Sequence, residues 1–147
     1  MTNYLIVNGP NLNLLGTRDT ATYGTQTLAD INARIEARAK ELGVEVLFFQ
    51  ANGEGAIIDF VQDNTAAAAG IIINPGAYGH YSYSIHDALK DTGLPIAEVH
   101  LSNVYARDSW RSELVVAPIA RGVISGFGWR GYIAALELLV ALDRESG

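Results

Sequence analysis

The sequence predicts an α/β fold, in which a parallel sheet carries helices on both faces. Short and almost wholly apolar segments indicate buried strands at residues 4–8, 44–49, 70–74, 96–100 and 122–125. Segments with apolar residues at helical spacing separate most of them, at residues 27–42, 56–69, 82–91 and 129–143. Strands that alternate with helices in this way are typical of a doubly wound parallel sheet.

The helix over residues 27–42 has the clearest boundaries. Thr27 followed by Asp30 is typical of a capping box, and Gly43 follows as a C-terminal stop. Ala66 to Ala69 extends the second helix, because alanine is a good helix former. Five strands without an internal repeat predict one domain over residues 1–147, with a flavodoxin-like five-stranded sheet.

Composition excludes several classes of function. The chain of 147 residues has a net charge of −6 and no basic cluster, which argues against a nucleic-acid or anionic-membrane surface. Cysteine is absent, so disulfides and thiolate metal sites are excluded. No leader opens the chain, and no apolar run reaches the ~18 residues of a membrane span. We expect a cytoplasmic protein.

The connection after the first strand, residues 9–24, is too long for a simple turn. Loops between a strand and a helix usually take about 2–6 residues, and longer ones are often functional lids. This loop carries Asn11, Arg18 and Tyr23. A guanidinium beside a tyrosine favours the phenolate, so Arg18 and Tyr23 predict a general base.

Hydrogen-bonding residues recur where the predicted strands end. In open parallel sheets, ligands bind outside the carboxyl ends of the strands. Asparagine is common in turns, so one such residue alone predicts little. Repetition at four strand ends predicts a polar pocket for a hydroxylated ligand, formed by Asn8, Asn11, Gln50, Asn52, Asn74, His100 and Ser102.

Glu98 and His100 lie on one face of the fourth strand, because side chains alternate along a strand. A carboxylate there can hold the imidazole in one tautomer and favour its protonated form, which suits a general acid. The alternative is a core histidine satisfied by hydrogen bonds. His80 follows the third strand and could reach the pocket, whereas His86 falls within a helix. Their spacing does not predict a metal site.

Arg107 and Arg111 follow His100 and lie four residues apart. They either clamp a carboxylate or form a solvated helical face. Gly126 to Gly131 matches G-x-G-x-x-G, but no further strand with an acid follows, so these glycines indicate a tight turn and close helix packing. The last helix is apolar nearly all round except Glu137, which hints at a subunit interface.

Together, these residues resemble the type II 3-dehydroquinate dehydratases, the small dehydroquinases of aromatic amino-acid biosynthesis or quinate breakdown. The similarity runs from Tyr4 to about Leu142. The motifs that carry it are Asn8-Gly-Pro-Asn11-Leu12, Leu15-Gly16, Arg18, Tyr23-Gly24, Ile73-Asn-Pro-Gly-Ala-Tyr78 with His80, Asp87-Ala88, Glu98-Val-His-Leu-Ser-Asn103 and Ala106-Arg107 with Arg111.

The resemblance implies a lyase without a cofactor, which dehydrates 3-dehydroquinate to 3-dehydroshikimate by anti elimination through an enolate. It implies a homo-oligomer of trimers assembled into a dodecamer. Tyr23 would be the base, assisted by Arg18, Asn11 would hold the enolate through a water, and His100, oriented by Glu98, would be the acid. The residues implied in substrate binding are Asn74, His80, Leu101, Ser102, Arg111 and, from a neighbouring subunit, Asp87.

The chain departs from the usual pattern of that family at Gly53, Gly79, Tyr81, His86 and Glu113-Leu114. None of these changes removes a group implied in catalysis. They do bear on the subunit contact and on the pocket wall between His80 and Asp87.

Other classes of function stay open. A lysine imine would need Lys40 or Lys90, both on predicted helix surfaces. A flavin-binding or receiver module would share the fold, although the first strand of a receiver ends in acids and this one ends in Asn8. A role in quinate breakdown and a catalytically inert relative also remain.

Overall fold

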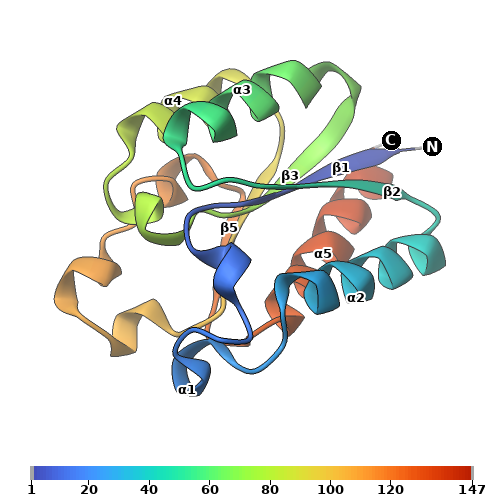
Figure 1. The fold of residues 1–147 in the computed structure, drawn as a ribbon. Coiled ribbons are helices and arrows are strands. Elements are labelled where there is room, and N and C mark those ends of the chain that lie inside the picture. Colours follow the sequence, from blue (N-terminus) through green and yellow to red (C-terminus); the bar gives the residue numbers. More distant parts are fainter. Residues whose placement is uncertain (1, 147) are drawn as a thin grey trace.

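The structure is a computed structural model and describes residues 2–146. Its centre is a five-stranded parallel sheet with the strand order β2-β1-β3-β4-β5 (Figure 1). This order is the flavodoxin-like one. The strands are β1 (Asn3–Asn8), β2 (Glu45–Gln50), β3 (Ala68–Asn74), β4 (Ile96–His100) and β5 (Gly122–Ser125).

Helices cover both faces of the sheet. Helices α2 (Leu28–Leu42) and α5 (Arg130–Ser146) pack on one face, and α3 (Glu54–Asn64) and α4 (Tyr83–Asp91) pack on the other. Because side chains alternate along a strand, Tyr4 and Ile6 of β1 join the first core, whereas Leu5 and Val7 join the second. The predicted fold class is therefore confirmed. Within residues 2–146, no helix combines the length and apolar character needed to cross a bilayer.

The predicted boundary between the second helix and the third strand is wrong. Helix α3 ends at Asn64, a 3-10 turn covers Thr65–Ala67, and β3 begins at Ala68. The side chains of Asn64 and Thr65 donate hydrogen bonds to carbonyl groups in the last turn of α3. Pairing of Ala68 with Asn3 of β1 then outweighs the helix propensity of alanine.

The predicted capping box is confirmed, with reciprocal hydrogen bonds between Thr27 and Asp30. The loop before it contains a 3-10 turn (Leu12–Leu14) and a single-turn helix, α1 (Thr20–Tyr23), which the sequence did not predict. Three more 3-10 turns follow β4, at Val104–Ala106, Ser109–Ser112 and Ala117–Ile119. The long loop and the segment after β4 together border the carboxyl ends of β1, β3 and β4.

Candidate active site

A cavity lies at the carboxyl ends of the central strands, where the sequence predicts a polar pocket. The long loop forms one side, and the segments that follow β3 and β4 form the other. Its lining residues are Pro10, Asn11, Leu12, Arg18, Tyr23, Asn74, Gly76, Ala77, His80, His100, Leu101, Ser102, Val104, Arg107 and Arg111. Most of the predicted site residues therefore meet in one place, although they come from distant parts of the chain.

Glu98 and His100 form a buried pair on β4. The imidazole Nε2 lies 2.5 Å from the Glu98 Oε2, and both side chains are almost fully buried. Because a carboxylate accepts, Nε2 carries a hydrogen and Nδ1 is left as the nitrogen for proton transfer. The pair has the geometry that a general acid requires.

His80 lies beside this pair with its own tautomer fixed. Its Nδ1 is 2.8 Å from the Glu113 carbonyl, which only accepts, so Nδ1 carries the hydrogen and the neutral ring leaves Nε2 as an acceptor. Burial lowers the pKa of His80, and the neighbouring His100 and Arg111 act in the same direction. The ring stacks on His100, with centroids 5.9 Å apart. His80 thus presents a neutral acceptor to the cavity.

Gly79 explains how this wall comes so close to the catalytic pair. A Cβ there would lie 2.7 Å from Pro75 Cγ and 3.4 Å from His100 Cε1. A glycine therefore lets the turn after β3 approach β4 more closely than a residue with a side chain permits. Gly79 is one of the departures from the family pattern noted above.

Tyr23 lines the cavity from the long loop, and two guanidinium groups contact its ring. The Arg18 Nη2 lies 3.4 Å from the Tyr23 hydroxyl oxygen, and the Arg18 Cζ lies 4.4 Å from the ring centroid. The Cζ of Arg107 is 5.1 Å from the same centroid, and its Nη1 donates to Ser102 Oγ. Tyr23 therefore presents its phenol to the cavity with two guanidinium groups in contact with its ring.

Asn11 borders the cavity in a left-handed backbone conformation, with φ at 68°. Its N–H donates to the Asn52 Oδ1 at 3.0 Å, and the Gln50 Nε2 donates to both Asn52 Oδ1 and the Gly9 carbonyl. The prediction that Asn8, Gln50 and Asn52 line the pocket is wrong, because none of the three borders the cavity. The buried Asn8 accepts a hydrogen bond from the Tyr132 hydroxyl. Gln50 and Asn52 instead hold the loop that carries Asn11.

Arg111 brings a guanidinium to the far wall of the cavity. It lies over the Trp110 ring, with its Cζ 4.2 Å from the centroid, and its buried Nε has no hydrogen-bond partner among residues 2–146. Trp110 also contacts the His80 ring edge to face. No pattern in the sequence predicted a role for Trp110, because its position depends on a 3-10 turn that propensity does not predict.

Asp87 lies outside this cavity. It is exposed on α4, where it pairs with the Nδ1 of His86 at 3.1 Å. Its role in the site of a neighbouring subunit stays a prediction.

The two lysines, Lys40 and Lys90, are also exposed and absent from the cavity lining, which leaves the imine alternative without a lysine amine in the cavity. Within residues 2–146, no cluster of histidine and carboxylate side chains is placed to hold a metal ion.

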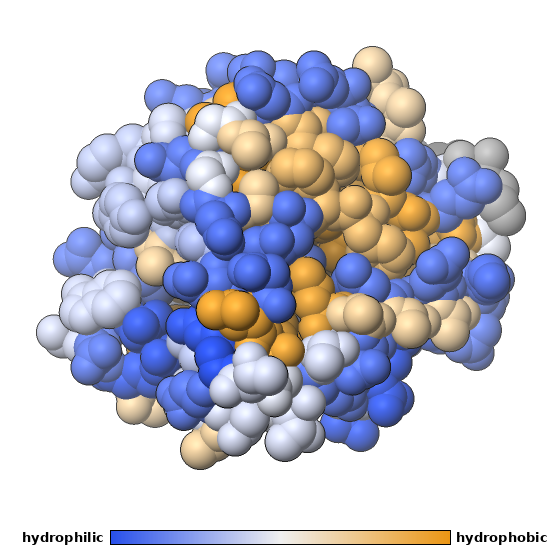
Figure 2. Space-filling view, in the orientation of Figure 1, coloured by the Kyte–Doolittle hydropathy of each residue, from blue (hydrophilic) through white to orange (hydrophobic). Residues whose placement is uncertain are grey.

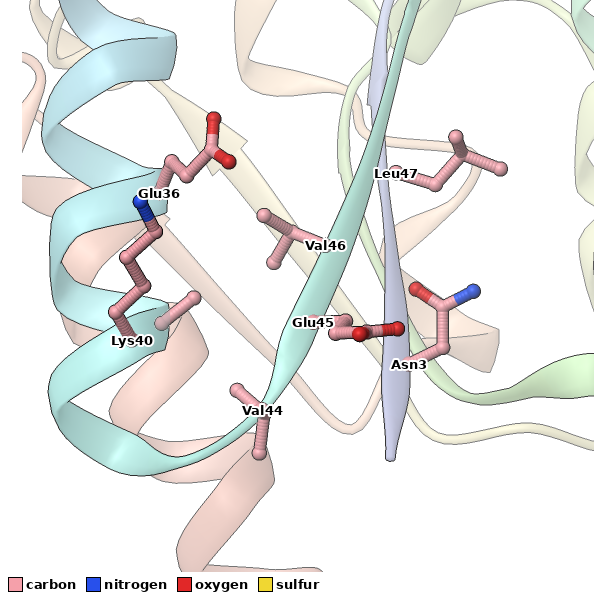
Figure 3. Close-up of a pocket in the computed structure, with 8 residues that line it drawn as sticks. Asn3, Glu36, Lys40, Val44, Glu45, Val46 and Leu47 are labelled. Atoms are coloured by element: carbon pink, nitrogen blue, oxygen red, sulfur yellow. The ribbon is translucent and has the colours of Figure 1, made fainter. Parts of the chain in front are cut away.

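A second hollow lies between α2 and the edge strand β2 (Figure 3). Glu36 and Lys40 border it on the helix, and Val46 faces them from the strand. Asn3 and Glu45 place it at the amino ends of β1 and β2, away from the strand ends at which ligands bind parallel sheets. Its charged side chains, Glu36, Lys40 and Glu45, are exposed, and neither a histidine nor an arginine lines it, so we assign it no chemistry.

Comparisons with known proteins identify the family of the chain. Residues 2–140 match the model of the class II dehydroquinase family. A 3-dehydroquinate dehydratase of Halothermothrix orenii is 50% identical over 145 residues, covering 99% of this chain and 98% of its own. One of Roseiflexus castenholzii is 52% identical, covering 92% and 87%. The crystal structure of type II dehydroquinase from Propionibacterium acnes superposes with a TM-score of 0.92 at 37% identity, covering 96% and 97%. The chain belongs to the class II dehydroquinase family.

Proposed function

We propose that this chain dehydrates 3-dehydroquinate to 3-dehydroshikimate in the shikimate pathway. One observation carries the proposal: a tyrosine held between two guanidinium groups faces a carboxylate-bound histidine across a single cavity. An elimination of water needs a base for the proton and an acid for the hydroxyl that leaves. The family match and the names of the relatives agree with this reaction.

The first step is removal of the proton next to the ketone. The Tyr23 phenolate takes it, and the electron pair of the broken C–H bond forms an enolate. Arg18 stabilises the phenolate before the step and the negative charge during it. Asn11, held in place by Asn52, would support the enolate oxygen through a water.

The second step is loss of the hydroxyl group. The enolate collapses to form the carbon–carbon double bond while the C–O bond breaks. His100 delivers a proton from Nδ1 to the departing oxygen, which leaves as water. Glu98 keeps the ring oriented and stabilises the imidazolium before the transfer. Tyr23 and His100 both line the cavity, the first from the long loop and the second from the end of β4, so base and acid reach the substrate from separate elements.

The remaining polar residues would bind the substrate. Arg111 offers a guanidinium to the substrate, and the backbone of Leu101 and Ser102 together with the Ser102 hydroxyl offers uncharged hydrogen bonds. Asn74 and His80 would bind the ring hydroxyls, with His80 accepting through Nε2. These contacts fix the substrate with its acidic proton toward Tyr23.

We also propose that the chain acts in the cytoplasm and assembles into trimers that join as a dodecamer. Two features support assembly. Apolar side chains gather over the edge strand β2, where Leu47 is exposed and Phe49 stacks on Phe60 (Figure 2). At the other edge, Val123 and Leu138 are exposed beside β5. Light scattering should give the mass of a dodecamer of the 15.8 kDa chain, and a monomer would contradict this proposal.

The direct test is an ultraviolet assay of the purified chain with 3-dehydroquinate. The conjugated enone of the product absorbs in the ultraviolet, so absorbance should rise without added nucleotide. Treatment with borohydride in the presence of substrate should leave the activity unchanged, because no imine forms. No rise in absorbance at micromolar enzyme would overturn the proposed reaction, and inactivation by borohydride would replace it with an imine mechanism.

A further inference from the structure

The glycine-rich turn before α5 has a role beyond allowing a tight turn. A Cβ on Gly131 would lie 3.2 Å from Val99 Cγ1 and 3.3 Å from Ile124 Cγ2, so the glycine lets α5 begin close against β4 and β5. The next residue, Tyr132, is completely buried under the sheet. The close approach thereby brings a phenol hydroxyl to the carboxyl ends of the central strands.

The Tyr132 hydroxyl joins the last residues of two neighbouring strands. It donates to the Asn8 Oδ1 at 2.6 Å and accepts from the Asn74 Nδ2 at 3.0 Å. Asn8 and Asn74 are register partners at the ends of β1 and β3. A hydroxyl has one hydrogen, so donation to Asn8 obliges it to accept from Asn74. Burial raises the pKa of Tyr132 far above its ordinary value, so the hydroxyl keeps that hydrogen.

The side-chain amide of Asn74 is consequently held at both ends. Its Nδ2 donates to Tyr132, and its Oδ1 accepts from the Gly76 N–H at 3.1 Å. Turning the amide over would place two donors together at Gly76 and two acceptors together at Tyr132. One N–H and one lone pair remain for a ligand, and Asn74 lines the active-site cavity while Tyr132 does not.

We propose that Tyr132 is a positioning residue, which fixes the orientation of the Asn74 amide that binds a substrate hydroxyl. The proposal rests on the proposed function of the cavity. Tyr132 never touches the substrate and acts only through Asn74. The contact with a hydroxyl is made in the ground state and in the transition state alike, so its loss weakens binding more than turnover.

The test is the Tyr132→Phe variant in steady-state kinetics with 3-dehydroquinate. KM should rise roughly tenfold, the usual effect of one lost hydrogen bond, while kcat changes by less than about twofold. A merely structural role would lower the folded fraction and hence kcat, and would leave KM unchanged. Tyr4→Phe is the matched control, because Tyr4 is equally buried and its hydroxyl has no partner among residues 2–146. Its KM should equal that of the wild type.

A double-mutant cycle tests whether the effect passes through Asn74. In an Asn74→Ala background, Tyr132→Phe should cause no further rise in KM. A single-variant KM within about twofold of the wild type would overturn the proposal, as would an equal rise in both backgrounds.

A second measurement does not depend on activity. In the wild-type chain, the Asn74 side-chain amide proton that is donated to Tyr132 should exchange with solvent at least about tenfold more slowly than the side-chain amide protons of the exposed Asn13. Equal exchange would overturn the positioning role even if Tyr132→Phe does not fold. An inactive wild-type enzyme with protected Asn74 protons would instead refute only the proposed reaction.

Discussion

The two walls of the cavity differ in how deeply their side chains are buried and in what holds them in place. The acid wall consists of strand ends, where Asn74, Glu98 and His100 are buried and hydrogen-bonded. The base wall is a loop, where Arg18 and Tyr23 are half-buried. Parallel strands position side chains rigidly through their ladders, whereas the loop depends on a few side-chain contacts.

This difference matches what the proposed acid and the proposed base each require. A buried carboxylate–imidazole pair is strong only where water is excluded, so it belongs on the sheet. The base must admit the substrate and then close over it, so it belongs on a segment that can move. The following predictions test that contrast.

Tyr23→Phe should have the largest effect, because it removes the base but leaves the wall that binds the substrate. We expect kcat to fall by roughly 10³-fold, with the dissociation constant of 3-dehydroshikimate changed by less than about threefold. Ultraviolet kinetics and calorimetry measure the two quantities. Tyr105→Phe, at an exposed tyrosine outside the cavity lining, should retain full activity. Turnover close to wild type in Tyr23→Phe would remove this residue from its role.

Glu98→Gln should lower kcat by roughly 10²-fold, because the imidazolium of His100 loses its counter-charge. The melting temperature should shift by less than about 4 °C, since glutamine keeps the shape and one acceptor oxygen. Glu137→Gln, which makes the same chemical change at an exposed contact with Arg38, is the control and should leave kcat unchanged. If Glu98→Gln unfolds the chain instead, the pair serves stability rather than catalysis.

The loop should be protected from cleavage when the cavity is filled. Trypsin cleaves after Arg18, and we expect 3-dehydroshikimate at ten times its dissociation constant to slow that cleavage about tenfold. Cleavage after the exposed Arg121 serves as an internal control and should not change. Equal slowing at both sites, or at neither, would show that the loop does not close over the ligand.

The smallest effect concerns the pH dependence of stability. Because burial lowers the pKa of His80, the folded chain binds fewer protons than the unfolded chain below the ordinary value of 6.5. Its contribution to stability is complete above pH 6.5 and declines as the pH falls toward the folded pKa. His80→Gln should therefore lose less stability than the wild type between pH 7.5 and pH 5, as measured by urea midpoints. An identical decline in both proteins would contradict a buried, neutral His80.

The residues on the strands could be predicted from the sequence, whereas the contacts of the loop could not. Strands β3 and β4 have almost wholly apolar segments, and the sequence correctly placed Asn74, Glu98 and His100 at or near their carboxyl ends. The period of a strand fixes which side chains share a face, which also put Glu98 and His100 together. The single turn of α1 and the hydrogen bond between the Asn11 N–H and Asn52 were not predicted. The hydrogen bond of Asn52 joins segments 41 residues apart, and Tyr23 of α1 lies against Arg107 from the segment after β4.

The sequence by itself determined the fold class, the capping box at Thr27 and most of the residues that line the cavity. These follow from local periodicity and from the rule that parallel strands end on one side. Only the tertiary structure decided which groups touch. It paired Arg107 with Tyr23, turned Asn52 toward the loop, and brought Tyr132 of the last helix beneath Asn8 and Asn74. The physical reason is that a hydrogen bond depends on distance and angle, which no pattern along one chain encodes.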